Sequence, residues 1–455
     1  MSDELFAKTP IPKAYMTLAL PVVMSMVVLL VYNMVDTFFI ALTGNTALIA
    51  GVSVCTPLFT LMLAFGDLFG LGGSSVIARL FGGGRKDDGR RLSIFCFYGA
   101  IAFGVVVMAV MLPLQEYVLN LLGAEGDVIP HAADYYFWFI AGAPFVIFSL
   151  VPTNLLRTAG CPKISMNASM LGAVINIMLD PVLIFGLGLG AAGAAMATVI
   201  GYMCSDIYAV RYIHYYCEDL SLELPRLKID RKEIQAIFSI GLAAAVTNFT
   251  QTLGIALTNR SLLPYGNDSI AVMGIVMKII MIVALVVVGL SFGGQPLIGY
   301  NYGAKDRERM QNVISFALKV VVGTSALLAI VLTLFAEPVI RIFLSEPVLI
   351  DQGKEMLRWQ LPAIIFMGVG LVLICTFQAT GKSLPSLFLS LCRQGIIYAA
   401  ALAILPVCFG YTGVIAAQLA ADMVTALIAA GLYRICLSAD FSRGRNNRFL
   451  RELDR

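Results

Sequence analysis

Long apolar runs separated by short polar segments make up most of this chain. Each run has roughly 20 residues or more, the length that an α-helix needs to cross the hydrocarbon core of a bilayer. The pattern predicts an all-α polytopic membrane protein. Its twelve expected spans lie at residues 14–41, 47–77, 92–113, 130–157, 164–186, 189–213, 233–259, 269–298, 311–335, 352–380, 384–405 and 411–436.

Four short motifs occur twice, 220 to 222 residues apart. They are Gly44-Asn45 and Gly266-Asn267, Phe81-Gly82 and Tyr302-Gly303, Arg157-Thr158-Ala159-Gly160 and Gln378-Ala379-Thr380-Gly381, and Gly190-x-x-Gly193 and Gly410-x-x-Gly413. A duplicated membrane chain is typical of transporters whose substrate passes between two related lobes. Because each half has an even number of spans, both halves enter from the same side. The lobes are therefore expected to be related by a pseudo-two-fold axis along the membrane normal.

The longest polar stretch between spans divides the chain near its midpoint. We predict an amino-terminal six-helix lobe at residues 1–213 and an inter-lobe linker at residues 214–231. A carboxy-terminal six-helix lobe with a basic tail is expected at residues 232–455.

The composition places this chain in a bilayer, and its basic residues indicate an orientation. Of its 455 residues 59% are hydrophobic and 13% are charged, whereas about a quarter are charged in an average soluble protein. If successive spans cross the membrane in opposite directions, 24 of the 31 Lys and Arg residues lie on one side of it. By the positive-inside rule that side is cytoplasmic, so both termini are expected in the cytoplasm of a cell with this protein in its plasma membrane. The net charge of +3 then reflects topology, and no nucleic-acid partner is expected.

Four polar residues inside the amino-terminal spans form a candidate ion site. Asp36 lies in the outer half of the first span, and in the fifth span Asn176 and Asp180 share one helical face. The sixth span enters from outside and brings Thr198 to a similar depth, because each helical residue advances about 1.5 Å. We therefore expect these four side chains at one level of the lobe.

The two acids suggest a coupled ion. Two carboxylates in a low-dielectric cavity do not both stay charged, so one takes up a proton or the pair binds a small cation. Either outcome would couple the activity of the protein to the binding of an ion. The alternative is a purely structural network, since Asn and Ser often join membrane helices by hydrogen bonds.

The charges of the other spans are expected to be structural. Lys278 and Asp422 lie at similar depths in the carboxy-terminal lobe and are predicted to form a neutralising pair. Asp67 and Asp206 lie toward the cytoplasmic ends of their spans, where water, Arg79 or Arg211 would neutralise them.

Catalytic and metal sites are not expected. His131 and His214 stand alone near helix ends, and the nine cysteines include no CxxC pair. An intramembrane enzyme would need a nucleophile and a base that converge, and no such cluster is evident. We therefore expect no metal, no cofactor and no enzymatic activity.

The ordered set of motifs resembles the multidrug and toxic compound extrusion (MATE) family over essentially the full length. The features that carry the resemblance are Pro21 and Asp36, Gly44-Asn45, Phe81-Gly82 with its basic loop, Arg157-Thr158-Ala159-Gly160, Asn176-x-x-x-Asp180-Pro181, Gly190-x-x-Gly193 with Thr198, and Tyr302-Gly303-Ala304. The resemblance implies a V-shaped bundle of two six-helix lobes. Such proteins export amphipathic, often cationic compounds in exchange for inward H⁺ or Na⁺.

The resemblance also assigns roles to residues. It matches four positions to an amino-lobe cation site: Asp36, Asn176, Asp180 and Thr198. Asn154 is expected to join them, and Pro21 matches a bend that responds to the ion. The NorM-like branch also uses acids in the seventh and tenth helices, but here the seventh has Asn248 and Gln251, and the tenth span has no acid beyond Glu355 near its outer end. This departure favours the DinF-like or MepA-like branches and places all coupling on the amino-terminal lobe.

A second function remains open at this point. A flippase for lipid-linked oligosaccharides or polysaccharides, from the same superfamily, would line its cavity with basic residues for pyrophosphate. Lys278, Lys319 and Arg393 are the candidates within the spans. The expected partners of the transporter are the lipid bilayer, a small amphipathic organic substrate and one coupling cation, and a monomer is expected.

Overall fold

A computed structural model describes the backbone of residues 4–223 and 229–453, and the side chains in these ranges except those of residues 248, 249, 252, 267 and 438–453. Positions 224–228 of the predicted linker, the side chain of Asn248 and the side chains of the basic tail therefore lie outside the described residues. Within the described ranges the chain is nearly all helical and contains no strand.

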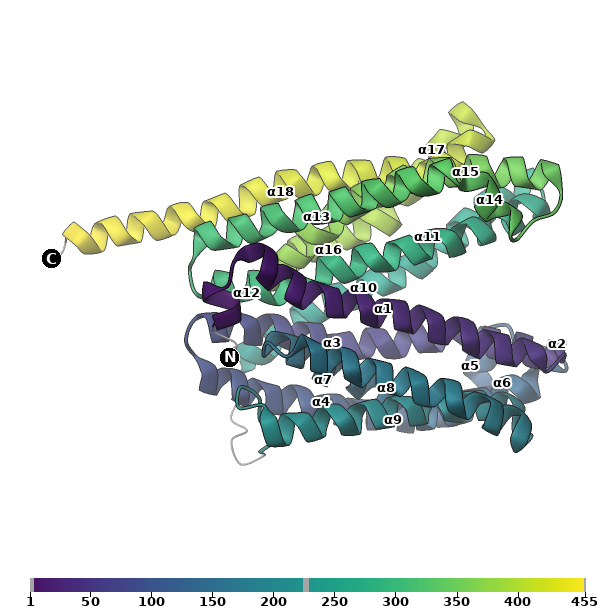
Figure 1. Cartoon of the computed structure of the whole chain (residues 1–455), viewed down its shortest axis with the longest axis horizontal. Helices are drawn as coiled ribbons and strands as arrows, with labels where there is room; N and C mark the ends of the chain where they lie inside the picture. The colour runs from purple at the N-terminus through teal and green to yellow at the C-terminus, as the bar shows by residue number, and fades with distance from the viewer. Residues whose placement is uncertain (1–3, 224–228, 454–455) are drawn as a thin grey trace.

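The helices run side by side along the long axis of the molecule, and the N and C labels lie at the same end of the bundle (Figure 1). The first half contains η1 (Glu4–Lys8), α1 (Ile11–Leu42), α2 (Thr46–Val54), α3 (Thr56–Gly82), α4 (Lys86–Met111), η2 (Leu112–Leu114), α5 (Gln115–Leu121), α6 (Val128–Ala141), α7 (Ala143–Thr158), α8 (Pro162–Pro181), η3 (Val182–Gly186) and α9 (Gly190–Tyr216). The second half contains α10 (Arg231–Leu262), η5 (Leu263–Tyr265), α11 (Asn267–Gly293), α12 (Gln295–Gly303), α13 (Arg307–Leu334), α14 (Ala336–Arg341), α15 (Pro347–Ala379), α16 (Ser383–Leu391), η6 (Cys392–Ile396), α17 (Ile397–Phe409) and α18 (Tyr411–Leu453).

The helices confirm the predicted fold class. Among the described residues ten helical segments are long and apolar enough to cross a membrane, and the pair α6 and α7, bent by 50° at Gly142, makes an eleventh. α10 has 32 residues and covers the seventh predicted span. Every predicted span thus coincides with a helix or with a helix pair broken by a short turn.

The repeated glycines hold equivalent turns in the two lobes. Gly160 and Gly381 end α7 and α15 with φ of +80° and +79°, and Gly190 and Gly410 have φ of +52° and +57°. A residue with a Cβ is strained at positive φ, so glycine is the residue that these turns require. Gly44 and Gly266 also have positive φ, of +65° and +95°, so this backbone demand explains three of the four repeated motifs.

The two lobes meet at one end of the bundle. We call it the basic end, because it carries the turns at residues 83–85 and 304–306 next to clusters of Lys and Arg. α1 packs against α11, and α3 packs against α10 and α12. The Tyr15 hydroxyl donates to the Leu290 carbonyl over 2.6 Å, and the Ser75 hydroxyl donates to the carbonyl of Gln378.

Six glycines allow this close approach, and we call them the glycine seam. At each of them a Cβ would overlap backbone of the opposite lobe. They are Gly72, Gly82, Gly241, Gly289, Gly293 and Gly303. Gly82 and Gly303 belong to the repeated motif Phe81-Gly82 and Tyr302-Gly303, so this repeat reflects contact between the lobes.

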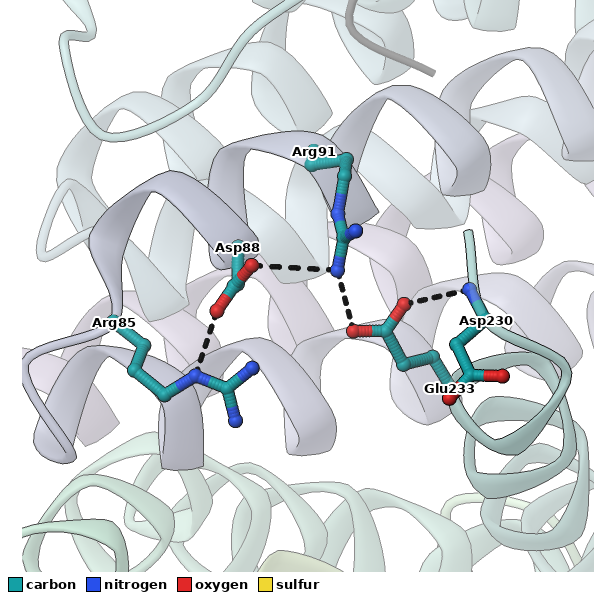
Figure 2. A network of polar contacts seen from close by, with 5 residues as sticks. All are labelled: Arg85, Asp88, Arg91, Asp230 and Glu233. Atoms are coloured by element: carbon teal, nitrogen blue, oxygen red, sulfur yellow. Dashed lines mark hydrogen bonds and ion pairs between the residues drawn. The ribbon is translucent and has the colours of Figure 1, made fainter. Parts of the chain in front are cut away.

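An ionic network also joins the lobes at the basic end (Figure 2). Arg91 of α4 donates from Nη2 to Glu233 Oε1 of α10 over 2.6 Å, and its Nη2 lies 3.3 Å from Asp88 Oδ1. Arg85 Nε donates to the other oxygen of Asp88 over 2.6 Å. Glu233 Oε2 accepts from the backbone N–H of Asp230, which completes a capping box at the start of α10.

Glu233→Gln separates these two roles of Glu233. Gln can still accept from the Asp230 N–H, but it loses the charge that pairs with Arg91. Because the pair is partly solvated, we expect the free energy of unfolding in detergent to fall by about 0.5–1 kcal/mol. Glu233→Ala should cost about 1 kcal/mol more, since it also removes the cap. Equal unfolding curves for wild type and Glu233→Gln would show that the ion pair contributes nothing.

Candidate functional site: a polar cluster in the amino-terminal lobe

Three helices bring the predicted site residues together. α1 packs against α8, and α8 packs along α9, which places Asp36 of α1 beside the polar face of α8. Asn176 Nδ2 of α8 donates to Thr198 Oγ1 of α9 over 3.4 Å. The helical spacing that predicted a shared face for Asn176 and Asp180 therefore agrees with the packing.

The two carboxylates of this cluster lack hydrogen-bond donors from the described residues. Asp180 is fully buried, and neither of its oxygens has a partner; Asp36 Oδ1 and Asn176 Oδ1 are likewise buried without one. Asp36 and Asp180 lie close enough for the charge of one to act on the other. Buried oxygens are normally hydrogen-bonded, so this group of free acceptors is suited to a proton or a small cation.

Three tyrosines surround the carboxylates, and sequence reasoning missed them. Tyr32 lies one helical turn before Asp36, and it lies within electrostatic range of Tyr202, which stands one turn after Thr198. Tyr135 of α6 lies within electrostatic range of both acids. The four-residue spacing from Asp36 and from Thr198 was the available signal for the first two.

Comparison with known proteins identifies the family. The sequence model of the MatE family matches this chain twice, at residues 21–182 and 243–404, and the two matches together cover more than half of it. The chain belongs to the MATE family. The two matches start 222 residues apart, in agreement with the internal repeat.

Relatives and solved structures support this assignment. The multidrug export protein MepA of Staphylococcus haemolyticus (strain JCSC1435) is 30% identical over 432 residues, which cover 94% of this chain and 95% of that protein. MepA of Staphylococcus aureus (strain NCTC 8325 / PS 47) is 30% identical over 437 residues, with coverage of 94% and 95%. These relatives agree with the expected MepA-like branch.

An outward-facing multidrug resistance transporter of the MATE family has a TM-score of 0.90 at 24% identity, covering 96% of this chain and 98% of that chain. A MATE protein in a straight conformation has a TM-score of 0.91 at 23% identity, with the same coverage, and shares the fold.

Asn154 makes its hydrogen bonds within its own helix in this MATE protein. Its Oδ1 accepts from Arg157 Nη2 over 2.6 Å, and its Nδ2 donates to the Leu150 carbonyl over 2.7 Å. Both groups of the amide are thus used within α7. The expected part of Asn154 in the cation site stays a prediction, and in the described conformation Arg157, one turn away, holds its amide oxygen.

Asp206 differs from its expected environment. It was predicted to be solvated or paired, yet only 5% of it is exposed and neither carboxylate oxygen has a hydrogen-bond partner among the described residues. Arg211 instead lies over the ring of Tyr215, with 5.9 Å from Cζ to the centroid. Asp67 lies within electrostatic range of Arg157.

Pro21 lies in the part of α1 that contacts the other lobe. It is flanked by Ala19 and Val23, which pack against Gly293 and Gly289 of α11. α1 continues through Pro21 as one helix, although the proline provides no N–H for the turn before it. A bend at this position would therefore act directly on the contact between the lobes.

The predicted pair of Lys278 and Asp422 was wrong. Asp422 Oδ1 lies 3.9 Å from Arg393 Nη1, and Asp422 Oδ2 accepts from Gln418 Nε2 over 2.8 Å. Lys278 is exposed on α11, which packs against α1 and α15. Similar depth along two helices did not make them neighbours; α18 packs instead against α17 and η6, which carries Arg393.

Proposed function

We propose that this MATE protein is a secondary antiporter that exports amphipathic, cationic organic compounds in exchange for inward H⁺ or Na⁺. The observation that carries the proposal is the pair of acids Asp36 and Asp180, held in membrane-embedded helices with free, buried oxygens. Unpaired carboxylates are costly at this depth, which supports a functional role. The multidrug export activity in the names of the MepA relatives supports the class of substrate.

The exchange follows from alternating access of the two lobes. In the described conformation the lobes are closed at the basic end by the glycine seam and the Arg91–Glu233 pair. Ion binding at Asp36 and Asp180 neutralises the site, which changes the packing of α1 and lets the lobes separate at the basic end. Release of the ion restores the charge and the closed basic end, so ion flow drives substrate outward.

Counter-transport in proteoliposomes tests this function. The purified protein is reconstituted with an organic-cation dye, and a pH gradient or a Na⁺ gradient is imposed separately. Dye movement that depends on one of the gradients supports antiport and identifies the ion. Dye movement that is equal with and without both gradients would reject the proposal.

The basic end is proposed to face the cytoplasm, with both termini there and the protein acting as a plasma-membrane monomer. The orientation predicts that single cysteines at Asn45, Gly188 or Tyr411 react with an impermeant thiol reagent added to intact cells. Cysteines at Arg85, Ser221 or Lys305 should react only after the cells are opened. The native cysteines are first replaced to remove background. Labelling of the second group in intact cells would reverse the topology.

The flippase alternative loses one of its basic candidates. It requires free cations for a pyrophosphate group, but Arg393 is 95% buried and paired with Asp422. Lys278 and Lys319 remain exposed on α11 and α13. Ion-driven export is therefore the function that the described side chains support best.

A further inference from the structure

The internal repeat relates positions of the carboxy-terminal lobe to the cation site of the amino-terminal lobe. The two family matches end at residues 182 and 404, 222 positions apart, whereas Gly160 and Gly381 are 221 apart. The offset between the repeats thus changes by one within residues 381–404, the segment that contains the π-helical turn η6. A π-helical turn is how a helix accommodates a single extra residue, and such turns occur often at functional sites.

With an offset of 222 up to residue 182, and of 220 from the Gly190 and Gly410 pair onward, each residue of the amino-lobe cluster has a counterpart. Asp36, Asn176, Asp180, Thr198 and Tyr202 correspond to Thr258, Tyr398, Leu402, Gln418 and Asp422. The amino-terminal set contains two acids and no base. The carboxy-terminal set contains one acid, and Arg393 stands beside it.

The counterparts form a connected polar cluster of their own. The hydroxyls of Thr258 and Tyr398 share a hydrogen bond of 2.5 Å, and Gln418 Nε2 donates to Asp422 Oδ2 over 2.8 Å. The Tyr398 ring lies within electrostatic range of Asp422. The side chains of Arg393 and Asp422 are only 6% and 2% exposed. A cluster equivalent to the cation site is therefore present and shielded from water.

Arg393 reaches this cluster from the π-helical turn η6. Near the equivalent level of the amino-terminal lobe, Gly172 packs directly against backbone of Gly201 and leaves no room for a side chain. Arg393 Nη1 lies 3.9 Å from Asp422 Oδ1, and Nε and Nη1 of Arg393 have no hydrogen-bond partner among the described residues. Bidentate Arg–carboxylate pairs have N–O distances of about 2.7–2.9 Å. The guanidinium is thus a counter-charge beside Asp422 that is looser than a bidentate bridge.

We propose that the guanidinium of Arg393 acts as a tethered cation in the carboxy-lobe counterpart of the ion site, so that this lobe takes up no coupling ion. The inference rests on the proposed cation site at Asp36 and Asp180, and it extends that function by assigning all ion binding to one lobe for a physical reason. A carboxylate with a permanent positive neighbour has no net charge left for a mobile ion to neutralise. Removal of Arg393 leaves Asp422 unpaired in a buried place, and the site must then acquire a proton or a small cation.

Ion binding to purified protein tests the proposal. Radioactive Na⁺ binding and proton uptake after a pH step are measured on four proteins in detergent. They are the wild type, the double variant Asp36→Asn with Asp180→Asn, a triple variant that adds Arg393→Gln to the double variant, and a quadruple variant that adds Asp422→Asn to the triple variant. We expect specific ion binding in the wild type and none in the double variant. The triple variant with Arg393→Gln should bind an ion again, and the quadruple variant with Asp422→Asn should not. Arg393→Lys in the double-variant background keeps the positive charge and should show no specific ion binding.

Two results would overturn the proposal. The first is residual binding in the Asp36, Asp180 double variant that Asp422→Asn abolishes, because Arg393 would then not fill the site. The second is the absence of any new binding in a folded Arg393→Gln protein. If wild type itself binds no ion through Asp36 and Asp180, the proposed function fails, while the comparison of proteins that differ only at Arg393 still judges this inference.

A second measurement covers the case in which Arg393→Gln does not fold. Asp422→Asn alone leaves the guanidinium without its counter-charge, and an external anion should then take its place. Chloride, compared with gluconate, is expected to raise the unfolding temperature of Asp422→Asn but not of wild type. Equal shifts in both proteins would show that Arg393 does not depend on Asp422 for neutralisation and would contradict the proposal.

Discussion

Asp36→Asn is expected to insert and fold normally but to lose gradient-driven export. The amide keeps the shape of the carboxylate and resembles its neutral form, so the site can no longer alternate between charged and neutral states. A ligand that binds two conformations equally well does not shift the equilibrium between them. An ion gradient therefore cannot drive the conformational change of a variant whose site is permanently neutral. In the proteoliposome assay, dye movement by Asp36→Asn and by Asp180→Asn should fall to the level of protein-free vesicles, while substrate binding in detergent persists.

The control for this pair is an acid outside the cluster. Asp127 is exposed in the turn before α6, so Asp127→Asn should export at the wild-type rate. A folded double variant, Asp36→Asn with Asp180→Asn, that still pumps against a gradient would place coupling elsewhere. Asp206, buried and without a hydrogen-bond partner among the described residues, would be examined next.

Gly303→Leu is expected to prevent closure of the lobes at the basic end. A side chain at Gly303 would overlap the backbone of Arg79 in the opposite lobe, and the neighbouring backbone cannot move aside as a flexible side chain would. Overpacking of this kind typically costs about 1–3 kcal/mol, and here the cost falls on the closed conformation alone. The transporter should therefore remain open at the basic end, with export reduced to background and cysteines near the seam reactive from that end.

A glycine away from the seam provides the matched control. Gly323 of α13 is exposed, and a Cβ there would meet no atom within 4 Å. Gly323→Leu should therefore fold and export as wild type does. Wild-type export by Gly303→Leu would mean that the lobes do not need this close contact, and it would remove the seam from the transport cycle.

The helices and the duplication were predictable from the chain alone. The thickness of the hydrocarbon core sets the length of an apolar run, and the fixed rise and period of a helix set which residues share a face. Asn176 and Asp180 were therefore correctly assigned to one face of one helix. The Gly160 and Gly381 turns were also visible, because a left-handed residue that ends a helix is usually glycine.

Only the tertiary structure decided which helices are neighbours. Helical periodicity gives a residue its depth and its angle about its own axis, but it does not say which other helix stands opposite. For this reason Asp422 was matched by depth to Lys278, whereas the packing of η6 on α18 pairs it with Arg393. The glycine seam and the tyrosines around Asp36 arise from contacts between helices far apart in the chain, and such contacts depend on how whole surfaces fit rather than on any pattern within one span.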